Sequence, residues 1–261
     1  MAFRRILAVG AAAVLLAACT DGDGGDEGAG RTGVAQGPRP EFTDFCVQAL
    51  QTETYPEPGV DLSRLSPPEQ VQVVKAYASG LVAQAERVRA LAPEEIRTDV
   101  NVIVDGMVRI RDTGDFKVLE EERVVSATRR VHAFELENCG WARQDVVAVD
   151  HAYRGLPRSV AGGPRSFELE NEGKETHELV VLKINDNVTD PVDKLLELPR
   201  EQVGVRVTNA GSASAQPGEQ SFVVADLTPG RYALVCFIPV GGVSEGPPHF
   251  TRGMQAELRV S

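Results

Sequence analysis

The chain has 261 residues, of which 27 are basic and 38 are acidic, so its formal net charge is −11 at neutral pH. An acidic surface repels phosphates, which argues against nucleic acid or anionic lipid headgroups as partners. The charge is compatible with solubility or with docking to a basic protein, and by itself it names no partner.

The first residues have the pattern of a secretory signal. Arg4 and Arg5 precede an apolar run from Ile6 to Ala18, and small residues stand directly before Cys19. The run is too short to span a bilayer core of roughly 30 Å as a permanent helix. Bacterial lipoproteins begin in this way, although an ordinary cleaved signal with an incidental cysteine is the alternative. We therefore expect residues 1–18 to be removed and a lipid on Cys19 to anchor the protein outside the cytoplasmic membrane.

A tether and two domains are expected after the signal. Residues 19–40 are rich in glycine and acids, and they lack the apolar side chains that would offset the entropy of ordering. Apolar residues then recur at helical spacing, whereas from residue 144 short β-branched runs alternate with glycine, proline and asparagine turns. The fold class expected is α+β, with a helical bundle domain at 41–142 and a β-sandwich domain at 144–261.

Four helices are predicted in the first domain, at residues 41–53, 67–91, 93–111 and 115–138. Ser66 offers an N-cap, with proline next and Glu69 three residues on. Short connections favour an up-and-down bundle. No nucleophile lies near a plausible base, so we expect a spacer or interaction module, with His132 at the surface or rim and Met107 in the core.

The cysteines divide unequally. Cys46 and Cys139 stand at opposite ends of the helical domain, which in an exported protein predicts a disulfide between them. That pairing leaves Cys236 alone. A lone cysteine in an oxidising compartment is either a buried small hydrophobe or a metal ligand.

Short apolar runs separated by turn residues predict a β-sandwich in the second domain. The runs are 146–149, 167–169, 179–184, 203–207, 222–227, 232–238 and 256–260, with a helical insertion near 191–198.

Two histidines, a cysteine and a methionine are spaced as a copper site requires. His177 opens a strand in mid-domain, Cys236 ends a strand, His249 lies in the following loop, and Met254 enters the last strand. A thiolate and two imidazoles with a weak axial thioether form the electron-transfer copper arrangement. Taken singly, each residue can also be explained without a metal, as a loop histidine, a buried thiol or a core methionine. His151, on the first strand, is interpreted as structural.

Three segments resemble the cupredoxin family. Residues 169–178, LENEGKETHE, resemble the family's Asn-x-Gly turn before its first histidine, and residues 227–236, LTPGRYALVC, are similar to its PGxYxxxC strand. His249 to Met254 matches its His-x4-Met ending. The resemblance covers residues 146–261 and implies one type 1 copper site at His177, Cys236, His249 and Met254, with one-electron transfer.

The loop between Cys236 and His249 is longer than the family usually has. Its ends are tied to adjacent strands, so we expect His249 to return to the thiolate. Asn171 and Glu178 are expected to orient the ligands through hydrogen bonds.

The function predicted from the sequence is that of a lipid-anchored, extracytoplasmic copper protein that transfers single electrons or carries copper. Its partner would be a redox or copper-exchange protein, and it would catalyse no bond-making chemistry. The alternative is a metal-free scaffold or protein-binding lipoprotein with the same sandwich. A multicopper oxidase ranks third, because the chain has only four histidines.

Overall fold

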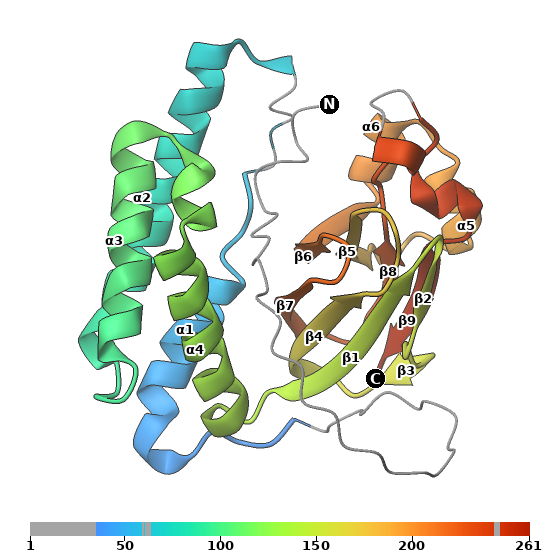
Figure 1. Cartoon of the computed structure of the whole chain (residues 1–261). Helices are drawn as coiled ribbons and strands as arrows, with labels where there is room; N and C mark the ends of the chain where they lie inside the picture. Colours follow the sequence, from blue (N-terminus) through green and yellow to red (C-terminus); the bar gives the residue numbers. More distant parts are fainter. Residues whose placement is uncertain (1–34, 59, 61–63, 243–245) are drawn as a thin grey trace.

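A computed structural model describes residues 35–58, 60, 64–242 and 246–261 of the chain. Helices come first and strands follow (Figure 1). The expected signal, Cys19 and most of the expected tether lie outside the described residues. No helix among the residues described is both long enough and apolar enough to cross a membrane.

The described part of the N-terminal half contains longer helices and short 3-10 segments. They are η2 (Pro40–Phe42), α1 (Thr43–Glu53), α2 (Pro67–Leu91), α3 (Arg97–Thr113), η4 (Phe116–Glu120) and α4 (Glu122–Asn138). The N-cap expected for α2 is present: the Ser66 backbone N–H donates to Glu69 at 2.8 Å, and the Ser66 hydroxyl caps the helix in return. α3 begins four residues later than predicted, because the chain turns at Pro93 and the Arg97 side chain caps the carbonyl of Ala92.

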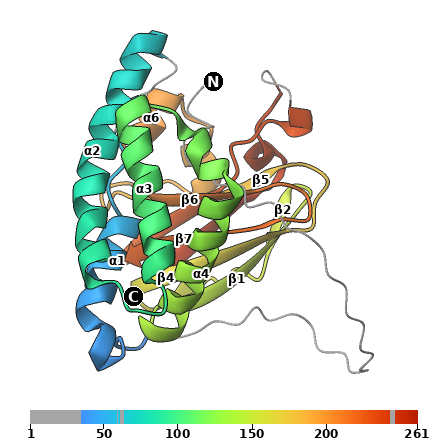
Figure 2. The same ribbon diagram turned by 60° about the vertical axis from the view of Figure 1, so that its left-hand side comes forward.

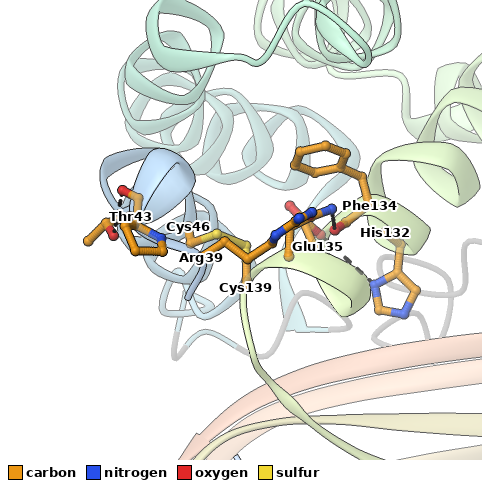
Figure 3. Close-up of a disulfide and its surroundings, with 9 residues drawn as sticks. Arg39, Thr43, Cys46, His132, Phe134, Glu135 and Cys139 are labelled. Atoms are coloured by element: carbon orange, nitrogen blue, oxygen red, sulfur yellow. Dashed lines mark hydrogen bonds and ion pairs between the residues drawn. A yellow bond between two sulfur atoms is a disulfide. The ribbon is translucent and has the colours of Figure 1, made fainter. Parts of the chain in front are cut away.

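A disulfide joins Cys46 on α1 to Cys139 at the end of α4, as expected from the sequence. Their Cα atoms are 5.3 Å apart and the two residues are 93 positions apart in sequence. Both half-cystines are buried in the apolar cluster of the helices (Figure 3). The bond therefore fixes the first helix against the last one.

The C-terminal half is a sandwich of two sheets. One sheet has the order β2-β1-β4-β7, and the other has the order β3-β9-β8-β5-β6. The strands are β1 (Ala142–Val149), β2 (Ala152–Arg154), β3 (Ser159–Val160), β4 (Gly163–Asn171), β5 (His177–Ile184), β6 (Val207–Ala215), β7 (Gln220–Leu227), β8 (Gly230–Val235) and β9 (Gln255–Val260). Buried side chains of both sheets form one apolar core between them.

The strand predicted at residues 203–207 is wrong. Val203 lies in the short helix α6 (Arg200–Gly204), and the strand β6 begins only at Val207. Its sequence of threonine, asparagine, glycine, serine and alanine lacks the β-branched run that marked the other strands. The expected helical insertion is present as α5 (Val192–Leu196), which packs on the outer face of the second sheet.

The helices cover the outer face of the first sheet. Phe222 and Val224 of β7 belong to the apolar cluster of α1–α4, and both ribbon views place these helices on one side of the strands (Figure 2). His132 is not a surface residue as expected. It is only 5% exposed and stacks on Phe222, with a ring-centroid distance of 3.4 Å.

Candidate metal centre

The four candidate ligands meet at one end of the sandwich and are all fully buried. His249 Nδ1 lies 3.2 Å from His177 Nδ1 and 3.3 Å from Cys236 Sγ. The ligand atoms of these three residues all lie within 4.8 Å of one another. Cys236 and His249, which are 59 and 72 positions after His177 in the sequence, thus lie beside it in the fold.

Strand alternation turns the cysteine inward. Tyr232, Leu234 and Cys236 belong to the core between the sheets, whereas Ala233 and Val235 face the opposite side. The backbone N–H of Glu178 lies 3.5 Å from Cys236 Sγ and points its donor at the sulfur. A donor of this kind stabilises a thiolate more than a thiol.

A tight turn presents His177. The Asn171 side chain accepts a hydrogen bond from Gly173 N and donates to the carbonyls of Glu175 and Ala215, each at 2.8 Å. A Cβ on Gly173 would lie 2.5 Å from His177 Nε2, so no larger residue fits without moving the ring. The Asn-x-Gly pattern is therefore required by the close approach of this loop to the imidazole.

The long loop after Cys236 does not separate His249 from the thiolate. Pro239 pairs with Pro248, and Val240 N donates to the carbonyl of Pro247 at 2.9 Å. Closer to the site, His249 N donates to the carbonyl of Ile238 at 2.8 Å. This pairing joins the two ends of the loop, so His249 stays close to Cys236 despite the length of the connection.

Met254 lies next to Cys236 and His249. Its backbone carbonyl accepts from Cys236 N at 3.1 Å, and its own N–H donates to the carbonyl of His249 at 3.2 Å. The Met254 side chain is fully buried in the core cluster that contains Cys236. Backbone hydrogen bonds therefore fix the cysteine, the second histidine and the methionine to one another.

Two carboxylates face the outer nitrogens of the imidazoles. Glu175 Oε2 lies 3.1 Å from His249 Nε2, and Asp150 Oδ1 lies 3.6 Å from His177 Nε2. Although burial would raise the pKa of Glu175, the Gly241 N–H and His249 outweigh it and lower that pKa, so the group is a carboxylate at neutral pH. The Glu175 acceptor holds the proton of His249 at Nε2 and leaves its Nδ1 with a lone pair, whereas Asp150 lies beyond hydrogen-bond distance of His177 Nε2.

Asn171 and Glu178, expected to orient the ligands, act on backbone atoms around them. Asn171 closes the loop before His177, and Glu178 Oε1 accepts from Phe237 N at 2.8 Å. The carboxylates at the rings, Asp150 and Glu175, were not foreseen. The sequence could have indicated Glu175, because this carboxylate stands only two residues before the candidate ligand His177.

His151 also lies at this end of the sandwich, in a turn and not on the first strand as expected. It occupies the two-residue turn between β1 and β2 with a φ of 66°, and its ring centroid is 5.2 Å from that of His249. His151, Glu175 and His249 form a second group whose possible ligand atoms lie within 4.8 Å of one another. The turn, rather than the strand, carries this imidazole to the site.

The donor set fits a soft cation. Burial first, and then the neighbouring His249, lower the pKa of His177, so its imidazole is neutral, which is the form that binds metals. Two ligand atoms on one ion, at bonds of about 2.0 to 2.3 Å, lie roughly 3.2 to 3.8 Å apart. The separations of 3.2 and 3.3 Å found here agree with that range. Two imidazoles, a thiol and a thioether in a buried pocket suit copper better than a hard cation.

Comparisons with known proteins give matches to solved structures only. No protein-family model and no curated protein matches the chain. An auracyanin B structure is 19% identical, with 46% of this chain and 88% of that chain covered and a TM-score of 0.31. A reduced auracyanin from Roseiflexus castenholzii is 17% identical, with 46% and 96% covered and a TM-score of 0.31. A copper-containing nitrite reductase from Thermus scotoductus is 14% identical, with 46% and 30% covered and a TM-score of 0.26.

These matches carry no argument about activity, because their identities and TM-scores are low. The assignment of the C-terminal half depends on its own geometry, namely two packed sheets and a buried His-Cys-His group with a buried methionine beside it. In these features the C-terminal half is cupredoxin-like.

Proposed function

We propose that the chain binds one copper ion through His177, Cys236, His249 and Met254 and serves as a carrier of single electrons or of copper. The observation that supports this proposal best is the convergence of two Nδ1 atoms and one sulfur within 4.8 Å in a fully buried pocket. When bound, copper would supply the one-electron redox chemistry. The protein would hold the ligands in place and exclude water from them.

The rigidity of the ligand loop supports electron transfer over reaction at the metal. Cys236, His249 and Met254 are linked by backbone hydrogen bonds, and none of the four side chains is accessible. A site already formed in the protein changes little between two oxidation states, which favours fast electron transfer. A substrate-binding site would need an open position at the metal.

Metal analysis tests the proposal. Protein expressed in an oxidising compartment with copper supplied should contain about one copper per chain and show the intense blue absorption of a copper–thiolate bond. Cys236→Ser should abolish this absorption, because the thiolate supplies the donor orbital. Met254→Leu should retain the copper with a raised reduction potential, because the thioether is only a weak ligand. A folded protein that takes up no copper would exclude the carrier and favour the metal-free scaffold.

We also propose that a lipid on Cys19 anchors the protein outside the cytoplasmic membrane, where it would meet a redox or copper-exchange partner. This part is supported by the sequence before Cys19 alone. Intact mass measured on protein from membranes should show an acylated N-terminal cysteine, and Cys19→Ala should release the protein or block its processing. An unmodified cysteine would exclude the anchor.

An oxidase remains the third candidate. Among the described residues, two groups have the spacing of metal ligands, and both contain His249. A multicopper oxidase would need further imidazoles for additional copper ions, which the chain, with four histidines, does not supply. Copper stoichiometry distinguishes the two proposals, because an oxidase of this type would hold several ions per chain.

A further inference from the structure

A second candidate site lies between the helices and the first sheet, apart from the four copper ligands. A partly open cavity of about 230 Å³ is lined by residues of α1–α4, the η4 segment and β7. Its wall is mostly apolar, with Leu81, Ile103, Met107, Ile110, Leu119 and Phe222 among the lining residues. A dry cavity of about 150 Å³ is enough to bind benzene, so this one accommodates an aromatic ring with a short side chain.

Two buried polar groups, the Glu135 carboxyl group and the His132 imidazole, line this apolar space. Glu135 is only 2% exposed, whereas Glu53, which also lines the space, is exposed. The Nδ1 atom of His132 is buried without a hydrogen bond and lies 3.9 Å from Glu135 Oε2. Figure 3 shows this His132–Glu135 pair on α4. Polar groups buried in this way usually have a partner, because leaving them unsatisfied is costly.

The charge of the site is negative. Glu53 lines the cavity and also a second space of about 380 Å³. The second space is also lined by Glu57 and Asp226, against a single basic residue, Arg129. The His132 imidazole is already engaged through Nε2 with Glu168, at 2.9 Å. In their ionised form Glu53 and Glu135 accept hydrogen bonds and donate none, so a partner that stabilises this form must be a donor.

We propose that this cavity binds a small amphipathic organic cation, with its apolar body against the methionine and aliphatic side chains and its protonated nitrogen between Glu53 and Glu135. A cation offsets the repulsion between the two carboxylates, which a neutral donor does not. Desolvation raises the pKa of both groups, and Glu53 raises that of Glu135 further, so ionisation is unfavourable without a ligand and a bound cation would lower both pKa values. A metal ion fits less well, because these residues form none of the groups with metal-ligand spacing found in the described part of the chain.

Calorimetric titration of the complete chain with two matched probes tests the proposal. 2-Phenylethylamine carries an ammonium group, and 2-phenylethanol has nearly the same size and shape without the charge. The amine should bind with a stoichiometry of one, and the alcohol should bind roughly tenfold or more weakly, because hydrogen bonds to charged groups are the stronger ones. Glu135→Gln should weaken binding of the amine by a similar factor.

The matched control is Glu137→Gln, two residues along α4 at an exposed position, which should leave binding unchanged. Met107→Phe, which fills the cavity, should remove binding of both probes. If Glu135→Gln fails to fold by circular dichroism, Glu53→Gln replaces it. The proposal would be overturned by equal affinity for the two probes or by no binding of the amine at millimolar concentration. It would also be overturned if the Glu135 and Glu53 variants bound the amine as tightly as the parent.

Discussion

Glu175 contacts His249 on the side of the ring opposite Cys236. Its carboxylate lies 3.1 Å from Nε2, while Nδ1 of the same ring lies 3.3 Å from the cysteine sulfur. One residue thus sets which nitrogen carries the proton and which offers a lone pair to the metal pocket. The same carboxylate accepts from the backbone of Gly241, so the loop after Cys236 is attached to the loop before His177.

We expect Glu175→Gln to raise the reduction potential of bound copper. Removing a negative charge beside a ligand favours the reduced, less positive ion, by an amount on the order of tens of millivolts. Copper affinity should fall about tenfold, as is usual when the partner of a ligating histidine is changed. Glu172→Gln, at an exposed position in the same loop, is the control for both measurements. An unchanged potential would mean that the carboxylate does not act on the site.

Gly173→Ala should disturb the site with little loss of stability. The added methyl group would lie 2.5 Å from His177 Nε2 and 2.8 Å from Asp150 Oδ1, so the imidazole must move. We expect copper affinity to fall by at least about tenfold and the blue absorption to shift, as ligand displacement predicts. Gly204→Ala, where nothing lies within 4 Å of the new Cβ, should change neither. A Gly173→Ala protein with the original spectrum would show that the ring has room to adjust.

The convergence of His177, Cys236 and His249 was predictable from the sequence, because the chemistry of each residue is specific and its order along the chain is informative. Cys236, His249 and Met254 lie on one connection between two neighbouring strands, and such a connection keeps its ligands together whatever its length. His151 was misread because its turn has only two residues between β1 and β2, and periodicity does not resolve so short a hairpin.

The contact of the helices with the sheet was not foreseen for a different reason. His132, a polar residue on an amphipathic helix, has the pattern of a surface position. Its burial depends on contacts with Phe222 and Glu168 of the sheet. The sequence of the helix itself does not indicate these contacts. Strand β6 was missed because tertiary pairing with β5, rather than its own β propensity, makes Val207–Ala215 extended.

Removing the disulfide should destabilise the helical half. Cys46 and Cys139 close a loop whose ends are 93 residues apart, which in the chain-entropy model is worth about 4 to 5 kcal/mol. The Cys46→Ala/Cys139→Ala double variant should therefore lose several kcal/mol in urea unfolding. Its copper spectrum should persist under native conditions, because neither residue is near the ligands. Equal unfolding midpoints for the double variant and the oxidised parent would contradict the prediction.

Glu135 should make the protein less stable as the pH rises. Desolvation, followed by repulsion from Glu53, raises the pKa of Glu135 well above its ordinary value of 4.5. The folded state therefore binds this proton more tightly than the unfolded state, and the free energy of unfolding falls as the pH increases from about 4.5 through the raised pKa. Glu53 on α1, His132 on α4 and, through His132, Glu168 on β4 share this environment.

Glu135→Gln removes the charge and keeps the shape, so the variant should gain stability at neutral pH. It should also show a flatter dependence on pH than the parent, measured by urea unfolding at about pH 5 and about pH 8. Glu137→Gln on the exposed side of the same helix should keep the parent's slope, and an identical slope for Glu135→Gln would show that Glu135 does not cause it.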